Sequence, residues 1–431
     1  MLKLRIGNIL DRMDNNMTEW KECKISDIGT VVGGATPSTK NKKNYENGDI
    51  PWITPKDLST FYGRYIKCGE RNITKEGFDS CSTRLLPKNS VLFSSRAPIG
   101  YVAIAENEMC TNQGFKSVIP NKNIDSLFLY YLLKFNKDKI ESMGSGTTFK
   151  EISGNTMKNI KVCIPSDIKG QKKIAEILGN IDDKIEKNRE INNNLEQQAQ
   201  LLFKSWFVDF EPFNGTMPSD WEVVPFEKIV DFQNGYAFKS KELLNEPSSD
   251  CYQVFKQGHI ARGGGFIPDG TKSWYPKKLA SKLERFVLKK GDILMAMTDM
   301  KDNVAILGNT AIMPIDNEYI VNQRVGHLRV NGYKGITYPF IYLLTNSTDF
   351  LIDLRSRANS GVQVNLSSAE IKASQTVLPS EKVNTAFSEI TLPMFEAIIS
   401  NQLENQRLAQ LRDALLPKLM SGELDVSNID L

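Results

Sequence analysis

The chain has 431 residues, with 54 Lys and Arg against 51 Asp and Glu, and 40 % of its residues are hydrophobic. This length predicts two to four domains, and this composition excludes a disordered or fibrous protein. Six Cys without a C-x-x-C pair and 2 His argue against a disulfide framework, a structural zinc site and a His-based catalytic site. No apolar run approaches the ~20 residues that span a bilayer and no leader opens the chain, so we expect a cytoplasmic protein.

Short strands and amphipathic helices are predicted in chain order. Residues 90–94 and 101–105 are β-rich runs bounded by Pro, Gly or Asn, which predicts strands, and the apolar spacing over 124–142 predicts a helix. The second half repeats this order, with predicted strands at 293–297 and 304–307 and a predicted helix at 336–357. Both halves are therefore expected to be mixed α/β domains.

A long helix is predicted after each half. From Ile174 onward, apolar or small residues alternate in steps of four and three, which is a heptad seam. A second seam starts at Phe387 and breaks at Arg412, and Pro393 predicts a late start or a kink. Both seams are interrupted by Asn at matching positions. If the helices pair antiparallel, Asn188 would face Asn405 and Asn192 would face Asn401, fixing the register; simple solvation of these Asn is the alternative.

The two halves are copies of one another. Trp20 and Trp221 open the copies, the sequence TNQG at 111–114 returns as VNQR at 321–324, and Ile164-Pro165 returns as Leu378-Pro379. Ser145-Gly146 with Phe149 returns as Ser360-Gly361 with Val364. A period near 210 residues indicates a duplicated domain rather than a solenoid.

Positive charge is concentrated in the two copies. Residues 20–165 carry 21 Lys and Arg against 14 Asp and Glu, and residues 221–379 carry 19 against 16, whereas 166–215 and 380–431 are net acidic. Basic faces on two separate domains suit a polyanion, and acidic segments suit spacers or protein contacts. Chance variation on neutral surfaces remains an equal alternative.

Catalytic motifs are missing from the sequence. There is no G-x-x-x-x-G-K-[ST] loop, no G-x-G-x-x-G after a strand, no H-E-x-x-H and no Asn/Asp-Pro-Pro-aromatic motif. Gly-rich residues 33–38 are expected to form a turn, and residues 263–265 a hairpin tip. We therefore expect a non-catalytic chain without a metal site.

Basic and aromatic residues alternate in ways that suit DNA, with phosphate contacts for affinity and base-edge contacts for specificity. In the first copy the candidates are Lys40, Lys42, Lys43 and Tyr45, then Arg64, Lys67 and Arg71, then Thr147, Thr148 and Lys150 in a predicted phosphate-anchoring turn. In the second copy they are Lys256, Arg262, Lys272, Arg355, Arg357, Gln363 and Asn365. Gln363 and Asn365 can bond adenine in bidentate fashion, whereas Thr148 and Lys150 cannot, so the copies would read different sequences. Solvated loops and helix capping are the competing interpretations.

Five motifs in this order resemble the specificity (S) subunit of type I DNA restriction–modification enzymes, over residues 17–425. They are GDIPWITPKDL (48–58), SRAPIG (95–100) with the turn at 112–114, QKKIAEIL (171–178), LLFKSWFVDF (201–210) and LLPKLMSGEL (415–424). The second copy departs from the pattern, with AMTDMKD at 296–302 in place of SRAPIG. Residues 1–16 are either a short extension or lie before a true start at Met17.

The resemblance implies a fold and a set of partners. It implies two target-recognition domains, each reading half of a split DNA sequence, separated by two long antiparallel coiled-coil helices with pseudo-twofold symmetry. The helices would dock two methyltransferase (M) subunits, which recruit the nuclease (R) subunits; S-adenosylmethionine, ATP and magnesium would be bound by those partners. The expected segments are an extension at 1–19, recognition domains at 20–165 and 216–379, and helical segments at 166–215 and 380–431. An enzyme with a diverged site and a pure coiled-coil scaffold are the rival hypotheses.

Overall fold

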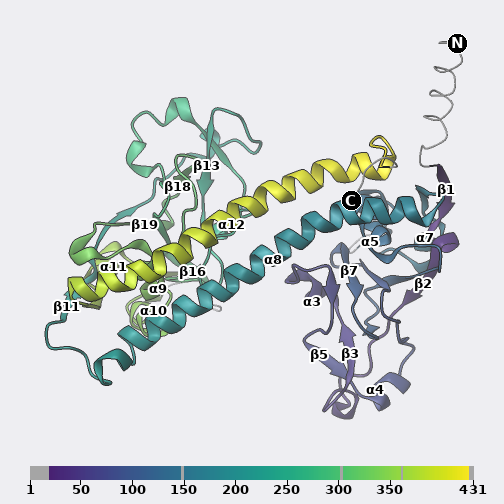
Figure 1. Cartoon of the computed structure of the whole chain (residues 1–431), viewed down its shortest axis with the longest axis horizontal. Helices are drawn as coiled ribbons and strands as arrows, with labels where there is room; N and C mark the ends of the chain where they lie inside the picture. The colour runs from purple at the N-terminus through teal and green to yellow at the C-terminus, as the bar shows by residue number, and fades with distance from the viewer. Residues whose placement is uncertain (1–18, 147–149, 301–303, 361–362, 427–431) are drawn as a thin grey trace, which may run out of the picture. The chain divides into compact units, whose positions relative to one another are not determined.

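The structure, a computed structural model, describes residues 19–146, 150–300, 304–360 and 363–426 (Figure 1). The chain forms two compact units: unit 1 is residues 1–187 with 405–431, and unit 2 is residues 188–404. Two long helices, α8 (Ile168–Phe207) and α12 (Glu381–Ser421), contribute to both units. Each unit therefore contains one globular domain and a part of each long helix.

The globular domain of unit 1 is built on three sheets. The five-stranded sheet has the order β2-β9-β6-β7-β4, the three-stranded sheet the order β5-β3-β8, and β1 pairs with β10. The strands are β1 (Trp20–Lys24), β2 (Gly29–Gly33), β3 (Ile50–Ile53), β4 (Tyr65–Ile66), β5 (Arg71–Ile73), β6 (Val91–Ser95), β7 (Ile99–Ala105), β8 (Cys110–Thr111), β9 (Lys116–Pro120) and β10 (Lys161–Pro165). The helices are α2 (Ile25–Ile28), α3 (Pro55–Ser59), α4 (Lys75–Asp79), α5 (Ser126–Phe135), α6 (Lys137–Ser142) and α7 (Gly154–Asn159).

The core of unit 1 joins the five-stranded sheet to α5 and to the long helices. Strand β6 is buried along its whole length, as expected of a central strand. Leu419 and Met420 near the end of α12, and Val426 beyond it, belong to the same buried cluster. A Cβ at Gly422, where φ is +76°, would lie 2.7 Å from Trp20 Nε1. The end of α12 therefore packs against the first strand of the domain.

Unit 2 repeats this topology. Strand β12 pairs with β19 as β2 does with β9, the parallel pair β13–β18 corresponds to β3–β8, and β11–β22 closes the domain as β1–β10 does. Its strands are β11 (Glu222–Pro225), β12 (Val230–Asn234), β13 (Cys251–Phe255), β14 (Trp274–Pro276), β15 (Ile293–Ala296), β16 (Thr298–Met300), β17 (Thr310–Ile312), β18 (Tyr319–Val321), β19 (Val325–Val330), β20 (Asn359–Ser360), β21 (Gln363–Asn365) and β22 (Gln375–Leu378). Its shorter helices are α9 (Tyr338–Thr345), α10 (Thr348–Ser356) and α11 (Ser368–Ala373). The expected duplicated α/β fold is confirmed.

The long helices run antiparallel within each unit. In unit 1, Arg412 Nη1 lies 2.7 Å from Asp182 Oδ1, and Asn405 Nδ2 donates to the Ile185 carbonyl at 3.4 Å. In unit 2, Asn401 and Asn192 are hydrogen-bonded, as described below. The α12 helix begins at Glu381 and continues through the exposed Pro393. Of the two expected effects of Pro393, the late start is wrong and the kink stays a prediction.

Three predicted elements differ from the structure. Residues 124–142 form two helices, α5 and α6, which meet at Asn136; its side-chain amide donates to the Leu132 carbonyl at 2.8 Å, beside the backbone bond from Asn136 N at 3.1 Å. Residues 336–357 likewise divide into α9 and α10, where Asn346 donates to the Tyr342 carbonyl (3.0 Å). Residues 304–307 form a loop instead of a strand, because Asp299 Oδ2 accepts their amide hydrogens, at 2.7 Å from both Ala305 N and Ile306 N.

Within the described residues, no helix is long and apolar enough to cross a membrane. The three glycines at 263–265 all have positive φ and form the expected tight turn between the bridged residues Ile260 and Phe266.

Candidate nucleic-acid interface

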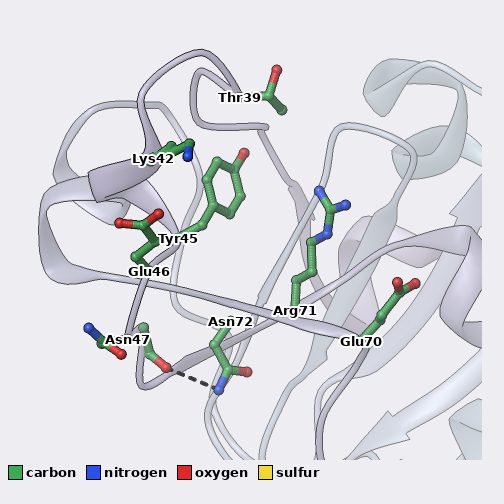
Figure 2. A pocket seen from close by; sticks show the side chains of 9 residues that line it. Thr39, Lys42, Tyr45, Glu46, Asn47, Glu70, Arg71 and Asn72 are labelled. Carbon is green, nitrogen blue, oxygen red and sulfur yellow. Dashed lines mark hydrogen bonds between the residues drawn. The ribbon is translucent and has the colours of Figure 1, made fainter.

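Three of the predicted DNA contacts of the first copy line one hollow. Lys42, Tyr45 and Arg71 border a surface pocket of about 480 Å³, together with Thr39, Glu46, Asn47, Gly48, Glu70 and Asn72. Figure 2 shows the Tyr45 ring and the Arg71 side chain pointing toward the same opening, near Thr39. The hollow therefore presents two cations and an aromatic ring beside two carboxylates, Glu46 and Glu70, the latter paired with Lys56 at 2.7 Å. The cations and the ring suit a phosphate with an adjoining base or sugar.

The walls of this hollow are held by hydrogen bonds. The Tyr45 hydroxyl donates to the Pro37 carbonyl at 2.7 Å, and the ring meets Trp52 edge-on at 6.0 Å between centroids. Asn72 Nδ2 donates to the Gly48 carbonyl at 3.2 Å, which is the dashed line in Figure 2. Burial raises the pKa of Tyr45, so its phenol stays protonated and keeps this bond. Lys40 and Lys43 are exposed in the same loop as Lys42, and Lys67 is exposed between β4 and β5.

Arg64 does not belong to this surface, so its expected DNA contact is corrected. Its side chain is 4 % exposed and is directed at helix α8, where Nε lies 3.1 Å from Glu186 Oε1 and Nη2 pairs with Asp183. Burial works against the charge, but the bonds to these carboxylates hold the pKa of the guanidinium above its usual value. The basic and aromatic residues around Arg64 in the sequence could not reveal that it is buried and paired, because both carboxylates lie far away in the sequence.

The residues on either side of the turn predicted at 145–150 form a bridged pair, which we call the hairpin neck. Ser145 and Glu151 are bridged, and Glu151 also bridges Arg96. The Glu151 carboxylate lies between two cations, 3.6 Å from Arg96 Nη1 and 3.5 Å from Lys116 Nζ. Thr147, Thr148 and Phe149 lie outside the described residues, and Lys150 is exposed. Arg96, Lys116 and Glu151 were not among the predicted site residues, although Arg96 lies in the SRAPIG motif.

The second copy builds the same arrangement from different residues. Strand β21 pairs with both β16 and β20, and its exposed Gln363 and Asn365 flank the buried Val364. Ile152 N donates to the Ser95 carbonyl (2.9 Å), as Leu366 N does to the Met297 carbonyl (2.9 Å). Ile152 therefore corresponds to Leu366, and Glu151 to Asn365. This corrects the alignment of Phe149 with Val364 made from the sequence.

The cations predicted for the second copy have different environments. Arg355 packs on the loop after β16, with Nε donating to the Leu307 carbonyl at 2.9 Å. Arg357 is paired with Asp353 at 3.0 Å, so its charge is already matched. Arg262 and Lys272 are exposed, the latter 3.4 Å from Asp269, and Lys256 is half-buried beside His259.

The helix Asn residues make polar contacts in the seam. Asn401 Nδ2 donates to Asn192 Oδ1 at 2.8 Å, and Asn192 Nδ2 donates to the Ile398 carbonyl at 3.2 Å. Asn188, 1 % exposed, donates to Glu404 Oε2 at 2.7 Å. Asn188 belongs to unit 2 and Asn405 to unit 1, so the contact expected between them stays a prediction.

Nothing in the described residues groups three or more His, Cys, Asp or Glu side chains as a metal site would. The buried His327 is held by Asp292 at 2.8 Å, and Asp292 also binds Arg329 at 2.6 Å. These contacts stabilise the sheet containing β15 and β19.

Comparison with known proteins identifies the family. The model of the type I restriction modification DNA specificity domain matches twice, at residues 17–197 and 218–412. The MjaIX specificity subunit of Methanocaldococcus jannaschii is 35 % identical, with 95 % of each chain covered. The HindI specificity subunit of Haemophilus influenzae is 24 % identical, over 95 % of this chain and all of the relative.

A solved structure shares the fold. The S subunit of a type I restriction–modification system from M. genitalium superposes with a TM-score of 0.59 at 18 % identity, covering 94 % of this chain and 97 % of that one. The two family matches cover most of the chain and coincide with its internal duplication. This chain belongs to the family of type I restriction–modification specificity subunits, which are non-catalytic.

Proposed function

We propose that this chain reads a split, asymmetric DNA site, with each globular domain contacting one half. The observation that carries the proposal is the shared hairpin neck. The same backbone bonds, from Ile152 to Ser95 and from Leu366 to Met297, place Glu151 in one domain where Asn365 stands in the other. Equivalent positions with unlike polar side chains are what two readers of different half-sites require.

The side chains suit different bases. Asn365 and Gln363 are exposed amides, and an amide can bond adenine at N6 and N7 together. Glu151 is an acceptor that suits the amino group of cytosine, and Arg96 beside it suits guanine. Lys42 and Arg71 at the first hollow supply phosphate contacts, and affinity that depends on them falls as salt rises.

The long helices are proposed to dock two methyltransferase (M) subunits, which recruit the nuclease (R) subunits. Apolar side chains exposed on both helices support this: Ile191 and Leu201 on α8, and Ile390 and Leu411 on α12. S-adenosylmethionine, ATP and magnesium are assigned to those partners, in the cytoplasm. The helix pair is also proposed to set the gap between the half-sites.

Mapping of methylated adenines tests the proposal. Cells carrying this chain with its M subunit are compared with cells lacking the chain. We expect a split motif that disappears with the chain, and replacement of residues 20–165 by a relative's domain should change one half alone. Unchanged methylation together with no DNA affinity of the purified complex would favour the scaffold hypothesis. Binding of S-adenosylmethionine by the isolated chain would favour the enzyme hypothesis.

Individual residues can be tested in the same complex. Asn365→Ala should relax one base position of the second half-site by about 1–3 kcal/mol. Lys42→Ala should weaken binding to all sequences equally and reduce the salt slope by about one. The matched control is Lys334→Ala, because Lys334 in unit 2 is paired with Glu222 away from the hairpin neck.

A further inference from the structure

Arg64 links the edge of the five-stranded sheet to helix α8 through side chain and backbone together. Its guanidinium contacts Glu186, Asp183 and the Gly179 carbonyl, the last at 3.3 Å. Its backbone N–H donates to Glu186 Oε1 at 3.0 Å, while its carbonyl accepts from Ile104 N in β7 at 2.7 Å. One buried residue is thus bonded to the sheet on one side and to the helix on the other.

The helix is shaped to receive this side chain. A Cβ at Gly179 would lie 3.3 Å from Arg64 Nη1 and 3.1 Å from Leu127 Cδ2. Glycine weakens a helix interior relative to alanine, so its presence inside α8 needs a local reason. The close approach of the guanidinium to the helix backbone supplies that reason. Gly179, Asp183 and Glu186 follow one another at spacings of four and three, which places them on one face of the helix.

The second unit has no equivalent of this contact among its described residues. At the corresponding positions of α12, which lie 213 residues further along, Leu392 replaces Gly179, Glu396 replaces Asp183 and Ile399 replaces Glu186. Glu396 is partly exposed, and it pairs with Lys290 and accepts from the Tyr338 hydroxyl at 2.8 Å. A flexible lysine on an exposed carboxylate fixes a position far less tightly than a buried, forked guanidinium does.

We propose that Arg64 is a positioning residue, which fixes where the first recognition domain sits on helix α8 and thereby sets the spacer length that the complex accepts. This inference rests on the proposed reading of a split site. Arg64 acts through strand β7, to which its carbonyl is bonded. Strands β6 and β7 flank the turn that contains Arg96, and Arg96 is bridged to Glu151 in the hairpin neck. A shift of the sheet on the helix moves that neck along the DNA, and one base pair is about 3.4 Å.

The complex of this chain with its M subunits is used to select DNA from two libraries. In the first library both half-sites are fixed and the spacer length varies. In the second library the half-sites are randomised as well. The variants are Arg64→Met, which keeps the aliphatic stem, and Arg64→Lys, which keeps the charge without the fork. For Arg64→Met we expect recovery of sites whose spacer differs by one base pair to rise about tenfold relative to the native spacer, with both half-sites unchanged. Arg64→Lys should lie between Met and wild type. Lys290→Met in unit 2 is the matched control and should leave the spacer profile unchanged.

The other outcomes separate the hypotheses. A loss of binding that is equal at every spacer would mean that Arg64 only stabilises the fold, and would overturn the positioning role. An altered base preference in the first half-site would overturn it in favour of direct DNA contact. If Arg64→Met fails to assemble, the spacer profile of Arg64→Lys decides in the same way. A wild-type complex that selects no split sequence would overturn the proposed function itself, and the positioning role with it.

Discussion

The two units attach their domains to the long helices by different chemistry. In unit 1 the Asp182 carboxylate, 5 % exposed, accepts from the Tyr131 hydroxyl at 2.6 Å and pairs with Arg412 at 2.7 Å. In unit 2, at the positions 213 residues away in the chain, Phe395 replaces Asp182, and Ala199 replaces Arg412.

In unit 2, packed aromatic rings take the place of this polar network. Phe387 lies within 4.8–6.2 Å, between ring centroids, of Phe203, Trp206, Phe207 and Phe340. The same backbone fold can therefore be attached to the long helices by a directional polar network or by an apolar cluster. Buried ion pairs contribute little net stability but fix geometry, whereas aromatic burial contributes stability.

The largest effect is expected in the aromatic cluster. Phe387→Ala should destabilise unit 2 by about 3–5 kcal/mol, because it removes a fully buried ring and leaves a cavity. Urea unfolding followed by tryptophan fluorescence would measure it, in a background where Trp20 and Trp52 of unit 1 are replaced by Phe so that the signal comes from unit 2. Val223→Ala, at an exposed site of the same unit, should change stability by less than about 0.5 kcal/mol. Equal losses for both variants would show that the cluster carries no special share of the stability.

The polar network should respond to removal of one partner and recover when both are replaced. Arg412→Ala leaves the Asp182 carboxylate buried beside Tyr131 and should cost about 3 kcal/mol. Adding Asp182→Phe imports the pair found in unit 2 and should restore part of that loss, because the buried Tyr131 hydroxyl then lacks its acceptor. Hydrogen exchange of the α8 amides in unit 1 would measure the stability of the single and of the double variant. A double variant as unstable as the single one would mean that the core of unit 1 cannot accommodate the Phe and Ala pair found in unit 2.

A pH dependence is expected in unit 2. Burial raises the pKa of Glu196, and the hydroxyl of Tyr342 at 2.5 Å offsets this in part. Because the folded state then holds the proton more tightly than the unfolded chain, unit 2 gains stability as the pH falls through the raised pKa toward 4.5, and lacks this gain at neutral pH. Glu196→Gln should therefore flatten the pH profile of unfolding above pH 4.5, whereas Tyr342→Phe should steepen it. A profile unchanged by either variant would contradict this assignment.

The smallest effect is expected at the exposed pair of unit 2. The side chains of Lys290 and Glu396 are 38 % and 45 % exposed. Lys290→Met removes their contact and should lower the free energy of unfolding by about 0–1 kcal/mol. Thermal unfolding in low and high salt would measure it, and salt should reduce the wild-type advantage further. A larger cost would show that unit 2 also depends on ion pairs, and the contrast with unit 1 would weaken.

Regular patterns in the sequence predicted most of the fold. The heptad steps and the paired Asn residues predicted both long helices, and the repeated motifs predicted the duplicated domain. The break at Arg412 was visible too, but its cause was not, because Asp182 lies 230 residues away. The strand predicted at 304–307 was wrong because one carboxylate, that of Asp299, accepts hydrogen bonds from three backbone amides and holds them in a loop. Local strand propensity does not take account of such a bond.

The candidate site was predicted less well for the same reason. Lys42, Tyr45 and Arg71 are brought together as a charged and aromatic surface, which their local context indicated. Arg64 shares that context but is buried by carboxylates about 120 residues further along. Glu151 was missed because its importance depends on Arg96 and Lys116, which reach it across strands. Burial and pairing at long range decide which basic residues are available, and neither can be read from neighbours in the chain.

The packing of Leu419, Met420 and Val426 into the core of unit 1 has a consequence for synthesis on the ribosome. Unit 2 is one continuous stretch of chain and can complete its core as soon as residue 404 has emerged. Unit 1 is translated first but finished last, because the apolar face of α8 around Ile174 and Leu178 lacks its covering residues until the end of α12 appears. The earlier domain therefore waits for the later one, and ribosome pausing before residues 419–426 are made prolongs the exposure of that face.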